Sequence, residues 1–400
     1  MDSLKRIEEA RENLRGIIRP TPMIHSEYFS RMSGNEVYIK PENYQKTGAF
    51  KIRGAYNRIS QLTEEEKSRG VICSSAGNHA QGVAYAAQQL GVKATIVMPN
   101  VTPLIKIEAT RDYGAEVILH GDVYDDAYAE ARRIQEETGA VFIHPFDDWD
   151  VIYGQGTIGL EILDELEDAD IVLVPVGGGG LISGIGLAIK ERNPKVRVIG
   201  VEPEGAQTLG HSIRKKSIVQ LDVVSTVAEG VAVRTPGKKT FEIVQGYVDE
   251  IMTIKDSELL ESFTILIEKH KMIAETAGIL PLAALKKLKV WGKKIVCVVS
   301  GGNIDVVNIS EMINRSLISR GRLFCFTVEL PDKPGELLNI SKILAEESAN
   351  VVKIEHNQFK TLDRLMQVAL ELTVETNGHD HIASVIGKLE AQGYSLHRVY

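Results

Sequence analysis

The sequence predicts an α/β fold with two open, mostly parallel sheets flanked by helices, followed by a small α+β domain of ferredoxin-like order. Short runs rich in valine and isoleucine alternate with helical patterns up to Ser300. The composition then changes after Arg320. The 400 residues also exceed what one ordinary hydrophobic core organises, so we expect two or three domains.

The predicted strands of the first part are apolar on both faces, which is typical of parallel strands covered by helices. They are 37–40, 71–74, 94–98, 116–119, 141–144, 171–176, 197–201 and 294–299. Helices are expected between them, among others at 79–90, 103–112, 124–137 and 181–191. Ligands of such sheets bind beyond the carboxyl ends of the strands. The segments that fall there are 74–75, 177–180 and 300–302.

The last part of the chain alternates strands and helices in the order β-α-β-β-α-β, the ferredoxin-like pattern. Its predicted strands are 323–330, 350–357, 364–374 and 395–400, with a helix that ends near Ser348 and a second helix at 382–392. We expect residues 314–321 to form the linker to this part.

Charge and composition exclude several classes of function. A net charge of −8 and a pI near 5.8 give no basic surface for nucleic acid, and no apolar run is long enough to span a bilayer. The N-terminal residues form a charged amphipathic helix, unlike a signal peptide. The cysteines Cys73, Cys297 and Cys325 have no paired spacing, so we expect free thiols in the reducing cytoplasm.

Four consecutive glycines follow the apolar run 171–176 and precede a helical pattern. Bare N–H groups at a helix start form a nest for an anion such as a phosphate. The dinucleotide fingerprint does not fit, because its third glycine position is Ile182, and the Walker A pattern is absent. The alternative is a tight turn that only lets the helix pack on the sheet. The phosphate-binding candidates are Gly177, Gly178, Gly179, Gly180 and Leu181.

Lys51 stands where a helical pattern begins, directly after Gly48-Ala49-Phe50. A partly desolvated lysine has a lowered pKa and becomes a nucleophile that can form a Schiff base. Phe50 beside it can pack on a flat cofactor. The alternative is a solvated surface charge, the usual state of a lysine. Together with the glycine run, Lys51 indicates an enzyme that holds pyridoxal 5′-phosphate (PLP) at both ends.

Two further segments follow predicted strands. Ser74-Ser75-Ala76-Gly77-Asn78-His79 brings together hydroxyls, an amide and helix-start N–H groups, which suit a carboxylate but also an ordinary helix cap. Ser300 can hydrogen-bond a ligand ring nitrogen, or Ser300-Gly301-Gly302-Asn303 is only a strand-to-helix turn. No His, Cys or carboxylate cluster has the spacing of a metal site, so no metal is expected.

Taken together, these segments resemble the fold type II PLP enzymes, which share the tryptophan synthase β fold, and within them the threonine dehydratases (threonine ammonia-lyases). The tail, with Pro331-Asp332-Lys333-Pro334-Gly335, resembles a single ACT domain, a small regulatory fold that often binds amino acids. The segments that match the threonine dehydratases are 42–55, 74–82, 144–147, 154–157, 177–181, 228–233 and 300–303.

This resemblance implies a division into a large PLP-binding domain (1–45 and 146–318), a small catalytic domain (46–145) and an ACT domain (322–400). It also implies roles for the residues of the site. For the cofactor, Lys51 forms the Schiff base, Phe50 packs on the ring, Asn78 hydrogen-bonds the ring hydroxyl and Ser300 the ring nitrogen, and Gly177 to Leu181 hold the phosphate. For the substrate, Ser75 with Asn78 and His79 holds the carboxylate. Gly230 lines the site, and Glu275 lies near the ring.

The chain departs from its relatives at several positions. Ala49 stands where many of them have serine. Ala76 replaces the second serine of serine racemases, which protonates the opposite face of the substrate, so elimination is favoured over racemisation. The divalent-ion site of those relatives maps to Glu202, Ala206 and Thr208, and Thr208 replaces a carboxylate.

The reaction implied by the resemblance is β-elimination of L-threonine, and of L-serine, to 2-oxobutanoate or pyruvate and ammonia. The ACT domain implies regulation by an amino acid such as isoleucine or valine, and a homodimer or homotetramer is expected. Serine racemase, a β-replacement enzyme such as cysteine synthase, and an amino-acid sensor with an inactive PLP fold are the alternatives. The choice between threonine and serine as the preferred substrate stays open at this point. So does the choice between a degradative role and a role in isoleucine biosynthesis.

Overall fold

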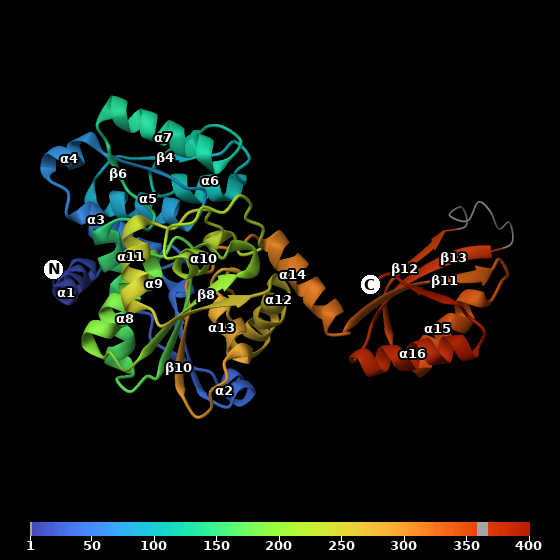
Figure 1. Cartoon of the computed structure of the whole chain (residues 1–400). Helices are drawn as coiled ribbons and strands as arrows, with labels where there is room; N and C mark the ends of the chain where they lie inside the picture. Colours follow the sequence, from blue (N-terminus) through green and yellow to red (C-terminus); the bar gives the residue numbers. More distant parts are fainter. Residues whose placement is uncertain (1, 358–366) are drawn as a thin grey trace. The chain divides into compact units, whose positions relative to one another are not determined.

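The structure is a computed structural model, and it describes residues 2–357 and 367–400. The chain forms two compact units, Met1–Ile304 and Asp305–Tyr400 (Figure 1). Two sheets lie in the first unit and one in the second. Within the described ranges, no helix has both the length and the apolar character needed to cross a bilayer.

The larger sheet of the first unit has the strand order β1-β2-β10-β7-β8-β9, and every pair except β1 with β2 is parallel. Valines of β7 and β10 pack against isoleucines of α9 (Gly180–Arg192) in one core, which is why these strands read as continuous apolar runs. The strands are β1 (Ile24–His25), β2 (Glu36–Pro41), β7 (Ile171–Pro175), β8 (Arg197–Pro203), β9 (Glu250–Ile254) and β10 (Lys294–Val299).

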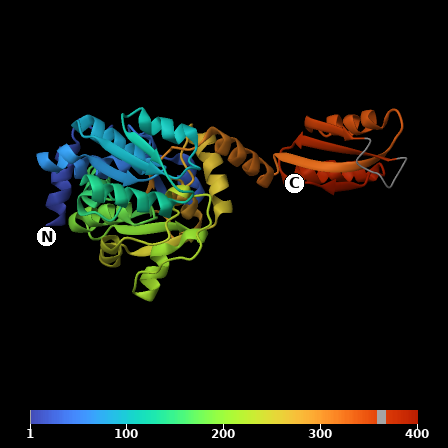
Figure 2. The same ribbon diagram turned by 90° about the horizontal axis from the view of Figure 1, so that it is seen from above.

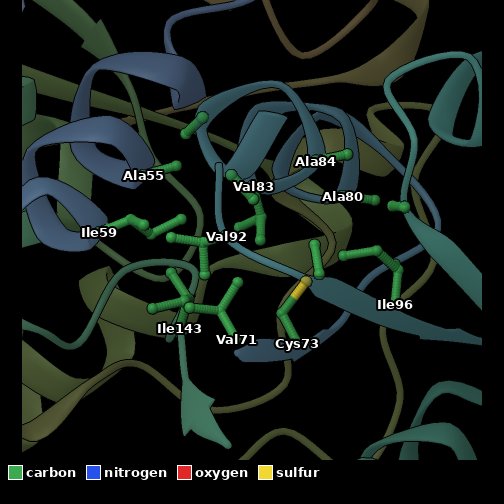
Figure 3. Close-up of a cluster of buried hydrophobic side chains, with 14 of the residues drawn as sticks. Ala55, Ile59, Val71, Cys73, Ala80, Val83, Ala84, Val92, Ile96 and Ile143 are labelled. Atoms are coloured by element: carbon green, nitrogen blue, oxygen red, sulfur yellow. The ribbon is translucent and has the colours of Figure 1, made fainter. Parts of the chain in front are cut away.

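The smaller sheet has the parallel order β5-β4-β3-β6. Side chains of β3 alternate between two cores, as the two-residue period of a strand requires. Val71 and Cys73 join a core with α3 and α5 (Figure 3), whereas Ile72 joins alanines of α7 on the other face. The elements are β3 (Val71–Ser74), β4 (Ala94–Met98), β5 (Glu116–Leu119), β6 (Val141–Phe142), α3 (Lys51–Ser60), α5 (Asn78–Leu90) and α7 (Tyr124–Thr138).

The helix α1 (Ser3–Leu14) closes the first unit on one side, where it packs on α8 (Trp149–Glu165), α9 and α3 (Figures 1 and 2). The other helices of this unit are α2 (Glu27–Ser33), α4 (Glu64–Arg69), α6 (Leu104–Arg111), α10 (Thr208–Lys215), α11 (Lys238–Tyr247), α12 (Asp256–Ile265) and α13 (Leu280–Ala284).

The second unit has a four-stranded antiparallel sheet in the order β12-β13-β11-β14. Its elements follow the predicted order β-α-β-β-α-β. Leucines, isoleucines and valines of α15 and α16 share one core with the sheet, so these two helices cover the same face (Figure 1). The elements are α14 (Val306–Ser319), β11 (Leu323–Pro331), α15 (Glu336–Glu346), β12 (Asn350–Asn357), β13 (Gln367–Glu375), α16 (His379–Ala391) and β14 (Leu396–Arg398).

The predicted strands of the first unit and the helices between them are confirmed, within a few residues at their ends. Two edge strands, β1 and β9, were not predicted, because β1 has only two residues and β9 begins at a charged, exposed glutamate. The linker prediction is wrong at residues 314–319, which lie in α14. Asp305 caps this helix, and Met312 and Ser316 are buried, so the polar residues at its end do not stop it from continuing to Ser319.

The division of the first unit into two domains stays a prediction. Each sheet draws all its strands from one of the two predicted domains, the larger sheet from 1–45 and 146–318 and the smaller sheet from 46–145. Of the predicted strand at 364–374, residues 364–366 lie outside the described ranges.

A buried ion pair connects α3 to the short 3-10 helix after β2 (Glu42–Tyr44) and to α8. Arg53 and Glu42 are both fully buried, and the guanidinium donates to both Glu42 carboxylate oxygens at 2.8 Å. Arg53 also donates to Glu161 of α8. Burial alone would lower the pKa of Arg53, but Glu42 and Glu161 raise it above its ordinary value. The helix that begins at Lys51 is therefore anchored by charge as well as by packing.

We predict that Arg53→Met lowers the free energy of unfolding of the first unit by about 3–5 kcal/mol, because Glu42 is left as a buried, unpaired carboxylate. Urea denaturation measures the change. Adding Glu42→Gln to this variant is expected to restore part of the loss. Arg133→Ala, which breaks an exposed ion pair, serves as the control with little effect. A loss for Arg53→Met as small as that of the control would contradict the prediction.

Candidate active site

An antiparallel pairing places Lys51 beside the end of β10. The N–H of Phe50 donates to the carbonyl of Ser300 at 3.0 Å, and the N–H of Gly302 donates to the carbonyl of Gly48 at 2.8 Å. Ala49 and Gly301 form the bridge between these two bonds. Gly48 has a φ of +72°, which a side chain rarely adopts, so glycine is needed at this turn. The segment before Lys51 is thus held as a short added strand.

The amine of Lys51 is partly buried and is hydrogen-bonded to a backbone carbonyl. Its Nζ donates to the carbonyl oxygen of Pro145 at 2.7 Å and lies 5.2 Å from the centre of the Phe50 ring. Burial lowers the pKa of Lys51 from 10.5 to about 8, and the nearby Glu275 opposes this shift. The prediction of a partly desolvated, reactive lysine agrees with this geometry.

The glycine run 177–180 lies between β7 and α9, as predicted. Among the backbone hydrogen bonds of the described residues outside helices and strands, none is donated by the N–H groups of residues 177–181. Gly179 has a φ of +94° at the start of α9. These features fit a phosphate, which unpaired N–H groups and the positive end of a helix bind together.

The same glycines are also required for packing against neighbouring segments. A Cβ on Gly177 would lie 2.9 Å from the Cα of Val231, and one on Gly180 would lie 2.8 Å from the Cβ of Phe146. A Cβ on Gly178 would overlap the Phe146 ring. Pro145 therefore contacts the amine of Lys51, and the next residue, Phe146, contacts the glycine loop. The amine and the loop lie on two sides of one turn.

Asn78, Glu275 and Asn303 form one hydrogen-bonded group beside the paired strands. Asn78 Nδ2 donates to both Glu275 carboxylate oxygens, at 2.8 and 3.0 Å. Asn78 Oδ1 accepts from Asn303 Nδ2 at 2.8 Å, and Asn303 also donates to the carbonyl of Thr47 at 2.8 Å. Burial raises the pKa of Glu275 to about 7. In the sequence, Asn303 was considered only as part of the turn after Ser300, and its contact with Asn78 has no signal there.

The remaining predicted residues lie at the start of α5. Ser75 Oγ accepts from the N–H of Gly77 at 3.2 Å, which closes the turn before the helix. His79 is buried, and its ring contacts the carbonyl of Ile143 at 2.8 Å through Nε2, while Nδ1 has no partner among the described residues. Burial, with Lys51 nearby, lowers the pKa of His79 to about 3. The His79 ring is thus a neutral anchor between α5 and the end of β6.

Ser300 and Gly230 lie at the same place. Ser300 is buried at the end of β10, next to the bridge with Ala49. A Cβ on Gly230 would lie 3.3 Å from Glu275 Oε1, so the backbone of Gly230 borders the carboxylate. The structure therefore brings Lys51, Ser300, Gly230, Glu275 and Asn78 together, although they are distant in sequence. Their roles toward a cofactor stay predictions.

Two of the residues that map to a divalent-ion site, Glu202 and Thr208, form hydrogen bonds to the backbone. Glu202 accepts the N–H groups of Leu209 and Gly210 at 2.8 and 3.0 Å, and Thr208 donates to the carbonyl of Val233. Burial raises the pKa of Glu202 to about 7. Across residues 2–357 and 367–400, no group of three His, Cys, Asp or Glu is arranged to hold a metal ion.

These observations together fit PLP: a lysine with a lowered pKa, unpaired N–H groups at a helix start, and a polar group near the lysine. The family model described as pyridoxal-phosphate dependent enzyme matches residues 14–301. The chain belongs to this family.

Similar PLP-dependent enzymes cover most of the chain. An L-threonine ammonia-lyase of Thermotoga maritima is 48% identical over 397 residues, which is 99% of each chain. The processed form of threonine deaminase isoform 2 from Solanum lycopersicum has a TM-score of 0.76 and 38% identity, over 79% of this chain and 88% of its own. Maize serine racemase has a TM-score of 0.74 and 36% identity, over 79% and 98%. The predicted family, PLP dependence and α/β fold are confirmed.

We predict that the cofactor-free protein reacts with added PLP at a rate that rises with pH and levels off above about 8. The protonated amine is not a nucleophile, and burial lowers the pKa of Lys51 to about 8 from the ordinary 10.5. Stopped-flow absorbance measures the rate. Glu275→Gln is expected to move the midpoint to lower pH, because the carboxylate of Glu275 raises the pKa of Lys51. A midpoint near 10.5 in the unmodified protein would contradict the prediction, and Lys51→Arg is the control that should not react.

Proposed function

We propose that this chain is a threonine ammonia-lyase, which eliminates the β-hydroxyl of L-threonine, and of L-serine, to give 2-oxobutanoate or pyruvate and ammonia. One observation carries the proposal. The amine of Lys51 and the glycine loop 177–180 contact consecutive residues, Pro145 and Phe146, so one turn joins the two groups that would hold the ends of PLP. The identity of 48% to an L-threonine ammonia-lyase over 99% of both chains supports this substrate.

In this proposal the side chains act as follows. Bound PLP supplies the electron sink for cleavage of the Cα–H bond. Lys51 Nζ takes the Cα proton, and its lowered pKa keeps part of the amine neutral near pH 7–8. Residues 177–181 bind the phosphate through their N–H groups, and Phe50 packs on the ring.

Asn78 and Ser300 would hold the ring of bound PLP, the first at its hydroxyl and the second at its nitrogen. The neutral hydroxyl of Ser300 would not strongly favour a protonated ring nitrogen, which would favour loss of the β-hydroxyl. Ser75 and the first turn of α5 bind the substrate carboxylate, because the N–H groups there point out of the helix end. No metal takes part in this scheme.

The function is tested by incubating the purified protein and PLP with L-threonine and, separately, with L-serine. We expect 2-oxobutanoate or pyruvate in equal amounts with ammonia, and loss of both products in Lys51→Ala. Formation of D-serine as the main product would favour a racemase. Formation of a new amino acid only after a thiol is added would favour a β-replacement enzyme, and no turnover in any assay would favour a sensor.

We further propose that the second unit is an ACT domain that binds an amino acid such as isoleucine or valine, and that the chain forms a homodimer or homotetramer in the cytoplasm. The β-α-β-β-α-β order supports the first part, and the three buried free cysteines are compatible with a reducing compartment. Calorimetry of the full chain with each amino acid, and light scattering, test these points. Absence of heat with any branched-chain amino acid would count against this effector class.

We predict that Ala76→Ser raises the rate of L-serine racemisation by about tenfold or more, since a hydroxyl in this position can return a proton to the opposite face of the substrate. Chiral chromatography of D-serine measures the rate. Ala76→Gly is the matched control, which changes the side chain without adding a proton donor. Equal D-serine formation in the two variants would show that this position does not supply the proton.

A further inference from the structure

The turn 144–147 is closed by the ring of His144. His144 Nδ1 accepts the N–H of Phe146 at 3.2 Å and the N–H of Asp147 at 2.8 Å. The ring also meets the Phe146 ring edge-on, with 4.7 Å between centroids and an angle of 89°. A single ring nitrogen therefore fixes the two peptide groups that follow Pro145.

The turn 144–147 makes three contacts, with the amine of Lys51, with the glycine loop and with α11. The carbonyl of Pro145 accepts from Lys51 Nζ at 2.7 Å. The Phe146 side chain fills the space that Gly178 and Gly180 leave open. The third contact is with α11, where Asp147 Oδ1 accepts the first-turn N–H groups at positions 239 and 240, at 2.8 and 3.3 Å.

The third contact returns to the phosphate loop. The hydroxyl of Thr240, in the first turn of α11, donates to the carbonyl of Gly178 at 2.7 Å. Asp147 holds that turn, and Phe146 packs on the loop directly. Two contacts thus connect the turn 144–147 to the glycine loop: the Phe146 side chain packs on the loop directly, and Asp147 reaches it through α11.

We propose that His144 is a positioning residue: by accepting two backbone hydrogen bonds at Nδ1, it holds the turn that sets the spacing between Lys51 and the phosphate loop. The role requires a lone pair on Nδ1, so the proton of the neutral ring lies on Nε2.

The charges around the ring agree with a neutral His144. Burial lowers its pKa to about 4. Asp147 and Asp148 oppose this shift, and Lys51 and Lys239 add to it. His79, the other ring near Lys51, is itself neutral at ordinary pH and adds no positive charge. The acceptor state is therefore the resting state of the ring.

Two substitutions separate the acceptor from the rest of the ring. In His144→Asn the amide Oδ1 takes the place of Nδ1, whereas in His144→Gln the acceptor lies one bond further from the backbone. The dissociation constants for PLP and for pyridoxal, which lacks the phosphate, are measured by titrating each cofactor-free protein and following visible absorbance. The inference rests on the PLP binding of the proposed function and does not depend on the substrate.

We expect His144→Asn to bind PLP as the unmodified protein does, and His144→Gln to bind it about ten- to a hundredfold more weakly, because two buried N–H groups lose their acceptor. The loss is expected to be smaller for pyridoxal, since it makes no use of the phosphate loop. Equal affinities in all three proteins, or equal losses in both variants, would overturn the inference. Failure of the unmodified protein to bind PLP would instead overturn the proposed function.

A second measurement keeps the inference testable if the glutamine variant does not fold. Nitrogen-15 NMR of the full-length, histidine-labelled protein reports the protonation of each ring nitrogen, and the His144 signal is identified by its absence in His144→Asn. We expect a proton on Nε2 and an unprotonated, hydrogen-bonded Nδ1. A proton on Nδ1 would overturn the inference.

Discussion

The pairing of residues 48–50 with 300–302 is the constraint on which the site depends. Two backbone hydrogen bonds and the Ala49–Gly301 bridge join the start of α3 to the end of β10. They are made by the main chain, and they fix Lys51 relative to the larger sheet. The buried Arg53–Glu42 pair then holds the first turn of the same helix from the other side. A nucleophile on a rigid element can be positioned more sharply than one on a free loop.

Around this pairing the site is stabilised mainly by neutral or weakly charged groups. Burial lowers the pKa of Lys51 to about 8 and raises that of Glu275 to about 7. Both groups therefore titrate close to neutral pH. His79 and His144 are neutral and serve as contacts to backbone groups. An anionic cofactor that enters such a site meets the N–H groups of the glycine loop and the amine of Lys51.

Several features of the site could be predicted from local sequence. The glycine run after an apolar strand, and the lysine at a helix start, are patterns of a few neighbouring residues, and both lie in the predicted elements. The linker at 314–319 was predicted wrongly, because these polar residues are the end of a helix that begins at Val306 with an Asp305 cap and several apolar residues. His144 and Asn303 lie in recognised segments, but their contacts with residues 146–147 and with Asn78 depend on the direction of a side chain.

The sequence by itself determined the order of strands and helices and the chemical groups on offer, because hydrophobic periodicity and backbone preference act over a few residues. Only the tertiary structure decided which of these groups meet. Pro145 and Phe146 lie between the lysine and the glycine loop since parallel strands of separate sheets end near each other there, and the lowered pKa of Lys51 follows from burial among segments distant in the chain. Desolvation and spacing are properties of packed neighbours, which no short stretch of residues encodes.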